Sequence, residues 1–130
     1  MSDDVRDQGM KTRREVLGDA HVDRAIAGTD AFNADFQELI TRYAWGGIWS
    51  RPGLDRRTRS CITIAMLASM GNEHELGMHI RAARRNGVSD AEIKEVLLQV
   101  AVYAGVARAN SAFAIAREAL ASDGDSSETP

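Results

Sequence analysis

The stretch CITIAMLASM, residues 61–70, is the strongest indication of fold class in this sequence. Its residues are apolar nearly all round a helix, which is the pattern of a helix buried on most sides, in a core or against a second subunit. Asp55 is suited to be the N-cap residue that starts this helix. We therefore expect a largely buried helix from Asp55 to Met70.

On both sides of this stretch the pattern is also helical. Residues 30–45 place apolar side chains three and four positions apart, as on one face of a helix. Residues 11–27 form a charged amphipathic stretch that Gly18 interrupts. Asparagine and serine caps and left-handed glycine stops then delimit three more helices. These are expected from Asn72 to Asn86, from Ser89 to near Gly105, and from about Ala107 to Leu120.

The predicted architecture is all-α, with about six helices in a single domain over residues 1–130. The stretch GGIWSRPG, residues 46–53, is expected to break the chain, because paired glycines followed by Pro-Gly do not continue a stable helix. Residues 1–10 are expected to be a flexible N-terminus. The polar and acidic residues 122–130 are expected to form a disordered tail.

Composition excludes several classes of protein. Apolar residues make up 44% and charged residues 27% of the 130 residues, which is a globular balance. A formal charge of -3 speaks against a general nucleic-acid binder. No apolar run is long enough to span a membrane, and the start lacks the apolar core of a signal peptide. The single cysteine, Cys61, excludes an internal disulfide. We expect a soluble, cytoplasmic protein.

The sequence HELGMH, residues 74–79, resembles the helical zinc motif HExxH but has one residue too many between its histidines. Positions five apart lie roughly 140° from one another around a helix, so His74 and His79 face different sides. No cluster of further ligands compensates for this geometry. The sequence therefore predicts no metal site here.

Glu75 and His79 are four residues apart, so the carboxylate can reach the imidazole one helical turn later. A carboxylate that orients a histidine fixes its tautomer and raises its basicity, which suits general acid–base catalysis. From spacing alone, a structural role is the favoured explanation of the same residues. Glu75 lies at the third position after the Asn72 cap, where glutamate is common, and His79 fits a half-buried helix position.

An arginine-rich and tryptophan-containing block precedes the apolar stretch. Arginine forks bind carboxylates in a bidentate way, and indole rings can line a pocket. The block therefore suits a small dianionic ligand. The alternative is that its arginines pair with nearby acids, which is favoured for Arg56, and that its tryptophans pack in a core. The residues of this block are Arg42, Trp45, Trp49, Arg51, Arg56, Arg57 and Arg59.

With these segments in place, the sequence closely resembles the carboxymuconolactone decarboxylase family from about Gly9 to Leu120. The landmarks are RREVLGDAHVDRA (13–25), FQELITRYAWGGIWSRPGLDRRTRS (36–60), ELGMHIRAARRNGVS (75–89) and EIKEVLLQVAVYAGVARAN (92–110). The resemblance implies an alkylhydroperoxidase D-like helical fold. The peroxidases of that superfamily carry a Cys-x-x-Cys pair where this chain has Asn72 and Glu75, so thiol peroxidase chemistry is excluded.

The resemblance implies a reaction and a set of site residues. The family converts 4-carboxymuconolactone into 3-oxoadipate enol-lactone and carbon dioxide without a cofactor, in the protocatechuate branch of the β-ketoadipate pathway. We expect His79, oriented by Glu75, to deliver the proton, with His21, His74 and Tyr103 as reserve donors. Substrate binding is expected from Arg51, Arg57, Arg59, Trp45 and Trp49.

The family also implies a homo-oligomer, commonly a hexamer, and the apolar residues 61–70 agree with burial against another subunit. Two other functions stay open at this stage. One is a related lactone-processing enzyme on the same scaffold. The other is a non-catalytic helical oligomer that binds small carboxylates.

Overall fold

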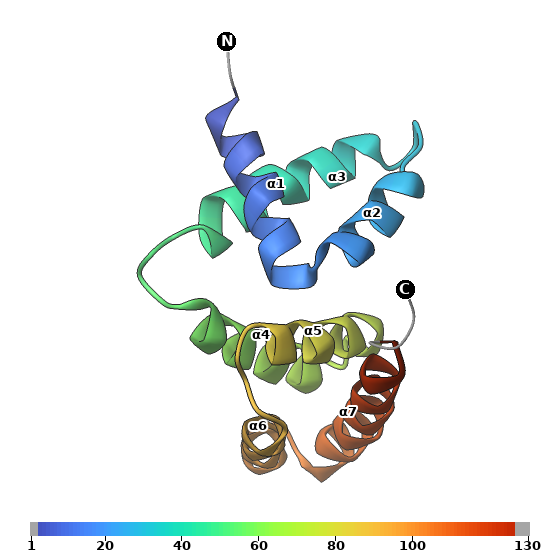
Figure 1. The fold of residues 1–130 in the computed structure, drawn as a ribbon. Coiled ribbons are helices and arrows are strands. Elements are labelled where there is room, and N and C mark those ends of the chain that lie inside the picture. Colours follow the sequence, from blue (N-terminus) through green and yellow to red (C-terminus); the bar gives the residue numbers. More distant parts are fainter. Residues whose placement is uncertain (1–2, 127–130) are drawn as a thin grey trace. The chain divides into compact units, whose positions relative to one another are not determined.

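The structure is a computed structural model that describes residues 3–126, and every regular element within that range is a helix (Figure 1). The all-α prediction is confirmed. The elements are α1 (Asp4–Leu17), α2 (Asp19–Ala27), α3 (Ala34–Ile40), the π-helix η1 (Thr41–Trp49), α4 (Arg56–Met70), α5 (Glu73–Arg85), α6 (Asp90–Tyr103) and α7 (Val106–Ser126).

The chain divides into two compact units, Met1–Arg56 and Arg57–Pro130. The first contains α1, α2, α3 and η1, and the second contains α4 from its second residue onward together with α5, α6 and α7. That the two units act as one domain stays a prediction.

The first unit is built on a close approach of α1 to η1. At Gly9, an added side chain would overlap the carbonyl oxygen of Thr41 and lie 2.9 Å from the amide nitrogen of Gly46. At Gly46, it would lie 2.6 Å from the carbonyl oxygen of Val5. Two glycines thus let the two helix backbones touch. The predicted break at residues 46–53 is therefore wrong in its first half, because the helix continues through Gly46 and Gly47 to Trp49.

The N-terminal residues are more regular than the sequence suggested. Residues 4–10, expected to be flexible, form the first half of α1, whose start is capped by the Asp3 side chain accepting a hydrogen bond from the Arg6 amide. Gly18, with φ of 92°, ends α1 and separates it from α2. The interruption expected at Gly18 is therefore a helix boundary. Residues 1–2 lie outside the described residues.

The second unit has a continuous hydrophobic core to which all four of its helices contribute. The N-terminus of α6 is fixed by the predicted capping box, in which Ser89 and Glu92 each bond the other's backbone amide. The largest fully buried core side chains are Ile64 of α4, Leu76 and Ile80 of α5, and Ile93 and Leu97 of α6, and small alanines of α7 pack against them.

Helix α4 begins directly after Asp55 and ends at Met70, as predicted. Only one side of it is buried in the chain itself, through Ser60, Ile64 and Ala68. The C-terminal end of the unit differs from the prediction. Helix α7 continues to Ser126, through the first five residues of the tail that was expected to be disordered. Residues 127–130 of that tail lie outside the described residues.

Candidate functional site

His79 lies on the inner face of α5. Leu76, His79, Ile80 and Ala83 recur at spacings of three and four, and all are buried, with His79 only 9% exposed. His74 on the same helix is exposed. The two histidines therefore have different surroundings, as their spacing predicted. Within residues 3–123, no three His, Cys, Asp or Glu side chains are grouped so as to hold a metal ion.

Glu75 lies one turn before His79 on α5, and its side chain is exposed. No hydrogen bond or ion pair joins Glu75 to a described residue, so the carboxylate–imidazole contact expected from the spacing is not formed in this conformation. An exposed glutamate changes rotamer at little cost, because no packing holds its side chain. Orientation of His79 by Glu75 stays a prediction.

The arginines at the start of α4 differ in their partners. Arg56 forms an ion pair of 2.8 Å with Glu15, as the alternative reading of this residue predicted. Arg57 forms an ion pair with Glu92, the capping-box glutamate of α6. Arg59, one turn into the helix, is half-buried. Arg57 is therefore engaged in holding α4 to α6, while Arg59 is the more sheltered of the two cations proposed on this helix.

Trp45 and Trp49 of η1 stack on each other in the first unit. Their ring centroids are 5.2 Å apart and their planes are tilted by 31°, a favourable offset geometry for aromatic rings. Trp45 is 6% exposed and so serves the core of its unit. Trp49 is half-buried, and Arg51 follows it as an exposed residue. The core-packing alternative therefore applies to Trp45, while Trp49 is the more exposed ring, and the role of the two rings in lining a pocket stays a prediction.

A chain of hydrogen bonds fixes this end of η1 to α1. The Ser50 hydroxyl donates to the carbonyl oxygen of Trp45 at 2.6 Å. Ser50 has a single hydroxyl hydrogen, so in its 2.7 Å contact with Thr12 the threonine must be the donor. Thr12 in turn accepts from Gln8 at 3.2 Å. The tryptophan pair is therefore positioned by side chains of α1.

Arg13 is a buried cation that the sequence analysis did not single out. It is 5% exposed, and its Nε atom is fully buried without a hydrogen-bond partner among the described residues. Burial, together with the neighbouring charge of Arg14, lowers the pKa of the Arg13 guanidinium. The signal in the sequence that could have indicated its burial is its spacing from inward-facing residues of the same helix. Arg13 lies four residues after Gly9 and three before Val16, both of which face inward.

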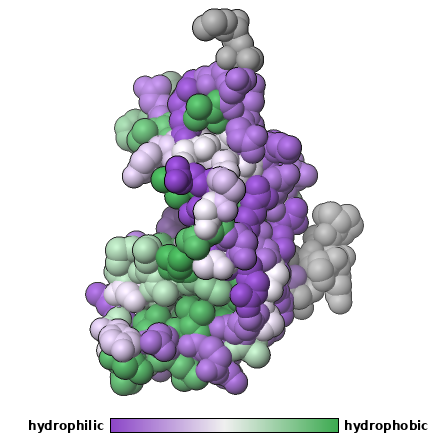
Figure 2. Space-filling view, turned by 90° about the vertical axis from the view of Figure 1, so that its left-hand side faces the viewer, coloured by the Kyte–Doolittle hydropathy of each residue, from purple (hydrophilic) through white to green (hydrophobic). Residues whose placement is uncertain are grey.

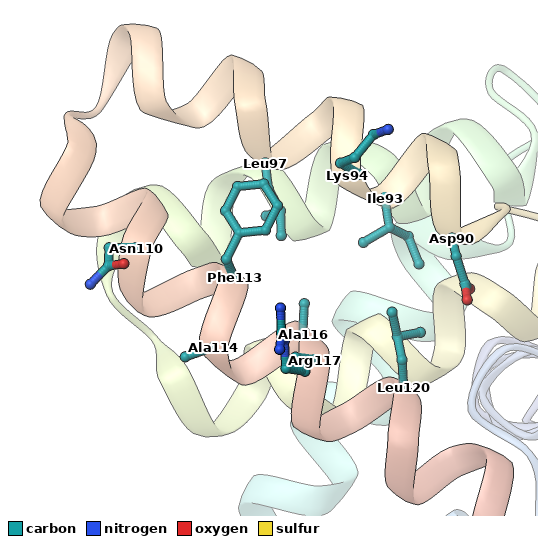
Figure 3. A pocket seen from close by; sticks show the side chains of 10 residues that line it. All are labelled: Asp90, Ile93, Lys94, Leu97, Asn110, Phe113, Ala114, Ala116, Arg117 and Leu120. Carbon is teal, nitrogen blue, oxygen red and sulfur yellow. The ribbon is translucent and has the colours of Figure 1, made fainter.

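A cavity of about 620 Å³ lies between α6 and α7 (Figure 3). Phe113 of α7 points toward Leu97 of α6, and the charged residues Lys94 and Arg117 also line the cavity. None of the predicted site residues lines it. Its size is that of a small-molecule pocket, and its lining comes from α6 and α7 alone.

Apolar side chains also gather on the surface of the second unit, as Figure 2 shows. On α4, Ile62, Met66 and Met70 recur every four residues and are exposed. On α6, Leu98 and Val102 do the same, and Tyr103 is 82% exposed. Among the described helices, none is both long and apolar enough to cross a lipid bilayer. The opposite sides of these two helices are buried in the unit, α4 through Ile64 and Ala68 and α6 through Ile93 and Leu97.

The family model of the carboxymuconolactone decarboxylase family matches residues 34–118, which is more than half of the chain and includes η1, α4, α5 and α6. The chain belongs to the carboxymuconolactone decarboxylase family. Membership agrees with the helical fold, and the matched range includes the block of tryptophans and arginines and His79.

Two relatives in this family have informative names. A 4-carboxymuconolactone decarboxylase of Acinetobacter baylyi is 50% identical over 119 residues, covering 91% of this chain and 89% of its own. A nitrosuccinic acid decarboxylase of Metarhizium robertsii is 46% identical over 99 residues, covering 76% of this chain and 69% of its own. Both relatives are decarboxylases of small organic acids.

Proposed function

We propose that this protein is a 4-carboxymuconolactone decarboxylase, which releases carbon dioxide from the lactone to give 3-oxoadipate enol-lactone. The observation that carries the proposal is the 50% identity to the Acinetobacter enzyme across nearly the full length of both chains. The reaction belongs to the protocatechuate branch of the β-ketoadipate pathway. A cytoplasmic location is the corresponding expectation.

The chemistry explains why no cofactor is needed. The departing carboxylate is attached to a ring carbon that is conjugated, through the ring double bond, to the lactone carbonyl. When the carbon–carbon bond breaks, its electron pair moves into the ring and negative charge develops on the carbonyl oxygen. A proton then adds to the ring carbon next to that carbonyl. The protein has to bind the acid, shelter it from water, stabilise the charged intermediate and deliver one proton.

His79 is the proposed proton donor. Its imidazole is nearly buried, so a proton placed there reaches a bound substrate without competition from bulk water. Imidazole changes its charge near neutral pH, which suits proton transfer to carbon. Glu75, one turn away and exposed, is proposed to orient the ring after a rotamer change.

The acetate side chain of the lactone is proposed to be bound by the cations Arg51, Arg57 and Arg59. The departing carboxylate is proposed to be sheltered by Trp45 and Trp49.

Arg51→Lys and Arg59→Lys should each raise KM for the lactone about tenfold, because the ammonium group of lysine makes one contact where the guanidinium makes two. Arg57→Lys should change KM less, since Arg57 already pairs with Glu92. Steady-state kinetics with the lactone measure this, and unchanged KM in all three variants would move the anion site elsewhere.

A second candidate substrate class comes from the Metarhizium relative. Nitrosuccinic acid is a succinate whose carbon next to the departing carboxylate carries a nitro group. The carboxylated lactone contains the same unit, because one ring carbon bears both a carboxylate and an acetate arm. In both molecules an electron-withdrawing group at that carbon, or conjugated with it, accepts the electron pair. The shared requirement is a succinate skeleton with a built-in electron acceptor.

One assay separates these functions. Protein treated with a chelator is given 4-carboxymuconolactone or nitrosuccinate, and carbon dioxide release is followed together with the organic product. We expect the lactone to be turned over with a kcat/KM at least tenfold above that for nitrosuccinate. Faster turnover of nitrosuccinate would favour the second class. Release from neither acid would favour a non-catalytic carboxylate-binding oligomer, and a requirement for added metal would contradict the cofactor-free mechanism.

We also propose that the protein is a homo-oligomer, with the family's hexamer as the expected number of subunits. The support is the repeat of exposed Ile62, Met66 and Met70 on α4, because contiguous apolar patches on a protein surface usually mark a contact surface.

Met66→Glu should dissociate the assembly, because it places a charge in this apolar surface. Arg85→Glu, at an exposed polar position of α5, is the control and should leave the assembly intact. Sedimentation equilibrium measures the mass, and a wild-type mass of one chain would contradict the proposal.

A further inference from the structure

The cations of the first unit show an unusual distribution of partners. Half-exposed arginines on α1, η1 and the start of α4 each have an acidic partner: Arg6 with Glu38, Arg14 with Asp19 and Asp23, Arg42 with Asp3 and Glu38, and Arg56 with Glu15. Arg13 is the buried arginine of the unit, and no acidic side chain among the described residues pairs with it. The most buried cation of the unit therefore has no counter-charge among the described residues.

The helix register fixes where Arg13 lies within its unit. One turn earlier, Gly9 packs against the backbone of η1 at Thr41 and Gly46. The adjacent Thr12 bonds to Ser50 at the end of η1. Positions one turn apart share a helix face, so Arg13 is on the side of α1 that meets η1, toward the end that carries the tryptophan pair.

Burying a cation without an anion is costly, and replacing such a residue by an apolar one commonly stabilises a protein. A site that keeps it despite this cost commonly does so for a ligand. Nε carries an N–H that donates to no described atom. An Nε–H and a neighbouring Nη–H together form the fork that binds both oxygens of one carboxylate. The unmet requirement of Arg13 is thus a carboxylate.

We propose that Arg13 binds the carboxylate that the substrate keeps, which is the distal carboxylate of its succinate skeleton. This inference rests on the proposed function and adds Arg13 to it as a further, buried cation for the acetate carboxylate, beside the cations Arg51, Arg57 and Arg59 proposed for it above. The carboxylate that leaves is a poor partner for a buried arginine. A tight ion pair there would stabilise the ground state and lose its charge as carbon dioxide forms. The retained carboxylate stays ionised throughout, so holding it positions the acid at no cost to the chemical step.

The test compares Arg13→Met with Arg14→Met, which removes a neighbouring arginine that has acidic partners of its own. Without ligand, Arg13→Met should unfold at the same temperature as the wild type or higher, because it removes an uncompensated buried charge. Succinate at high concentration should raise the unfolding temperature of the wild type and of Arg14→Met but not of Arg13→Met. Uncharged succinamide should raise none of them.

Kinetics give a second readout. Arg13→Met should raise KM for the lactone by roughly 10²-fold with a smaller fall in kcat, because a charged hydrogen-bonded contact to substrate is lost. The KM of Arg13→Lys should lie between those of the wild type and Arg13→Met, since lysine keeps the charge but loses the two-point contact of the guanidinium. Arg14→Met should leave both constants within about twofold, since exposed ion pairs contribute little.

Three results would overturn the inference. One is a ligand-free Arg13→Met protein that is less stable but keeps the succinate effect, which would make Arg13 a structural residue. Another is an unchanged KM in a folded Arg13→Met protein. The third is a change of subunit number in Arg13→Met, which would identify an acid of a second copy of this chain as the partner. If the wild type binds succinate through Arg13 but does not decarboxylate the lactone, the proposed function fails and the carboxylate site stands.

Discussion

His79→Gln is expected to lower kcat for decarboxylation by about 10² to 10⁴, the range typical of losing a general acid. Glutamine is close to histidine in size and keeps a polar group on the buried face of α5, so the fold should tolerate the change. It has no proton to give at neutral pH, and the charged intermediate must then take its proton from water. KM should change little, because binding of the acid is assigned to other residues. Initial rates of carbon dioxide release and of enol-lactone formation measure both constants.

His74→Gln is the matched control, since His74 is on the same helix but exposed. It should keep kcat within about twofold, as surface substitutions usually do little. Glu75→Gln should have an intermediate effect if the carboxylate orients the imidazole. A fall of less than about fivefold in His79→Gln, in protein with unchanged circular dichroism, would reassign the proton to another donor. A large effect in His74→Gln would have the same consequence.

The helices of the second unit could be predicted from the sequence because local signals and burial agree there. Ser89 and Glu92 form the expected capping box, and Gly87, with φ of 93°, follows the end of α5. The apolar residues of α5 and α6 then fall on the inner faces that their spacing predicts. Where cap, stop and periodicity point to the same boundary, the sequence is sufficient.

The first unit was harder to predict because tertiary contact overrides local propensity. Two adjacent glycines favour the end of a helix in an isolated peptide. Here Gly46 is needed where the backbone of α1 approaches, and that contact lies far away in sequence, at Val5 and Gly9. The π-helical form of η1 could not be predicted either, since a π-helix has no sequence signature of its own. Turns of π-helix are frequent near functional sites.

The candidate site was partly predictable for a related reason. Spacing on one helix was enough to predict that His74 and His79 face different sides, and the structure shows His79 to be the buried one. Whether an arginine has a partner depends on residues from other helices. Arg57 proved to be paired with Glu92 of α6, and of the neighbours Arg13 and Arg14 it is Arg13 that proved to be buried. Pairing and burial of charges are tertiary properties, and a single sequence does not encode them locally.

Gly9→Ala should destabilise the first unit by on the order of 3 kcal/mol, at the upper end of what overpacking costs. The added methyl group would overlap the Thr41 carbonyl and lie 2.9 Å from the amide nitrogen of Gly46. Both obstacles are backbone atoms, so no side chain can rotate to make room, and α1 and η1 must move apart. Such a loss is a large part of the 5–15 kcal/mol that stabilises a typical domain. Denaturant unfolding followed by tryptophan fluorescence reports on this unit, because both tryptophans of the chain are in η1.

Gly53→Ala is the control for this prediction, because a methyl group at Gly53 meets no atom within 4 Å and the residue does not have a positive φ. It should change the free energy of unfolding by less than about 0.5 kcal/mol.

The displacement of α1 in Gly9→Ala should also disturb the tryptophan pair, since Thr12 of α1 positions Ser50 and, through it, the Trp45 carbonyl. We therefore expect the tryptophan emission of the folded variant to shift and kcat/KM to fall. Equal stability of the two alanine variants would show that α1 and η1 do not approach as closely as the glycines indicate.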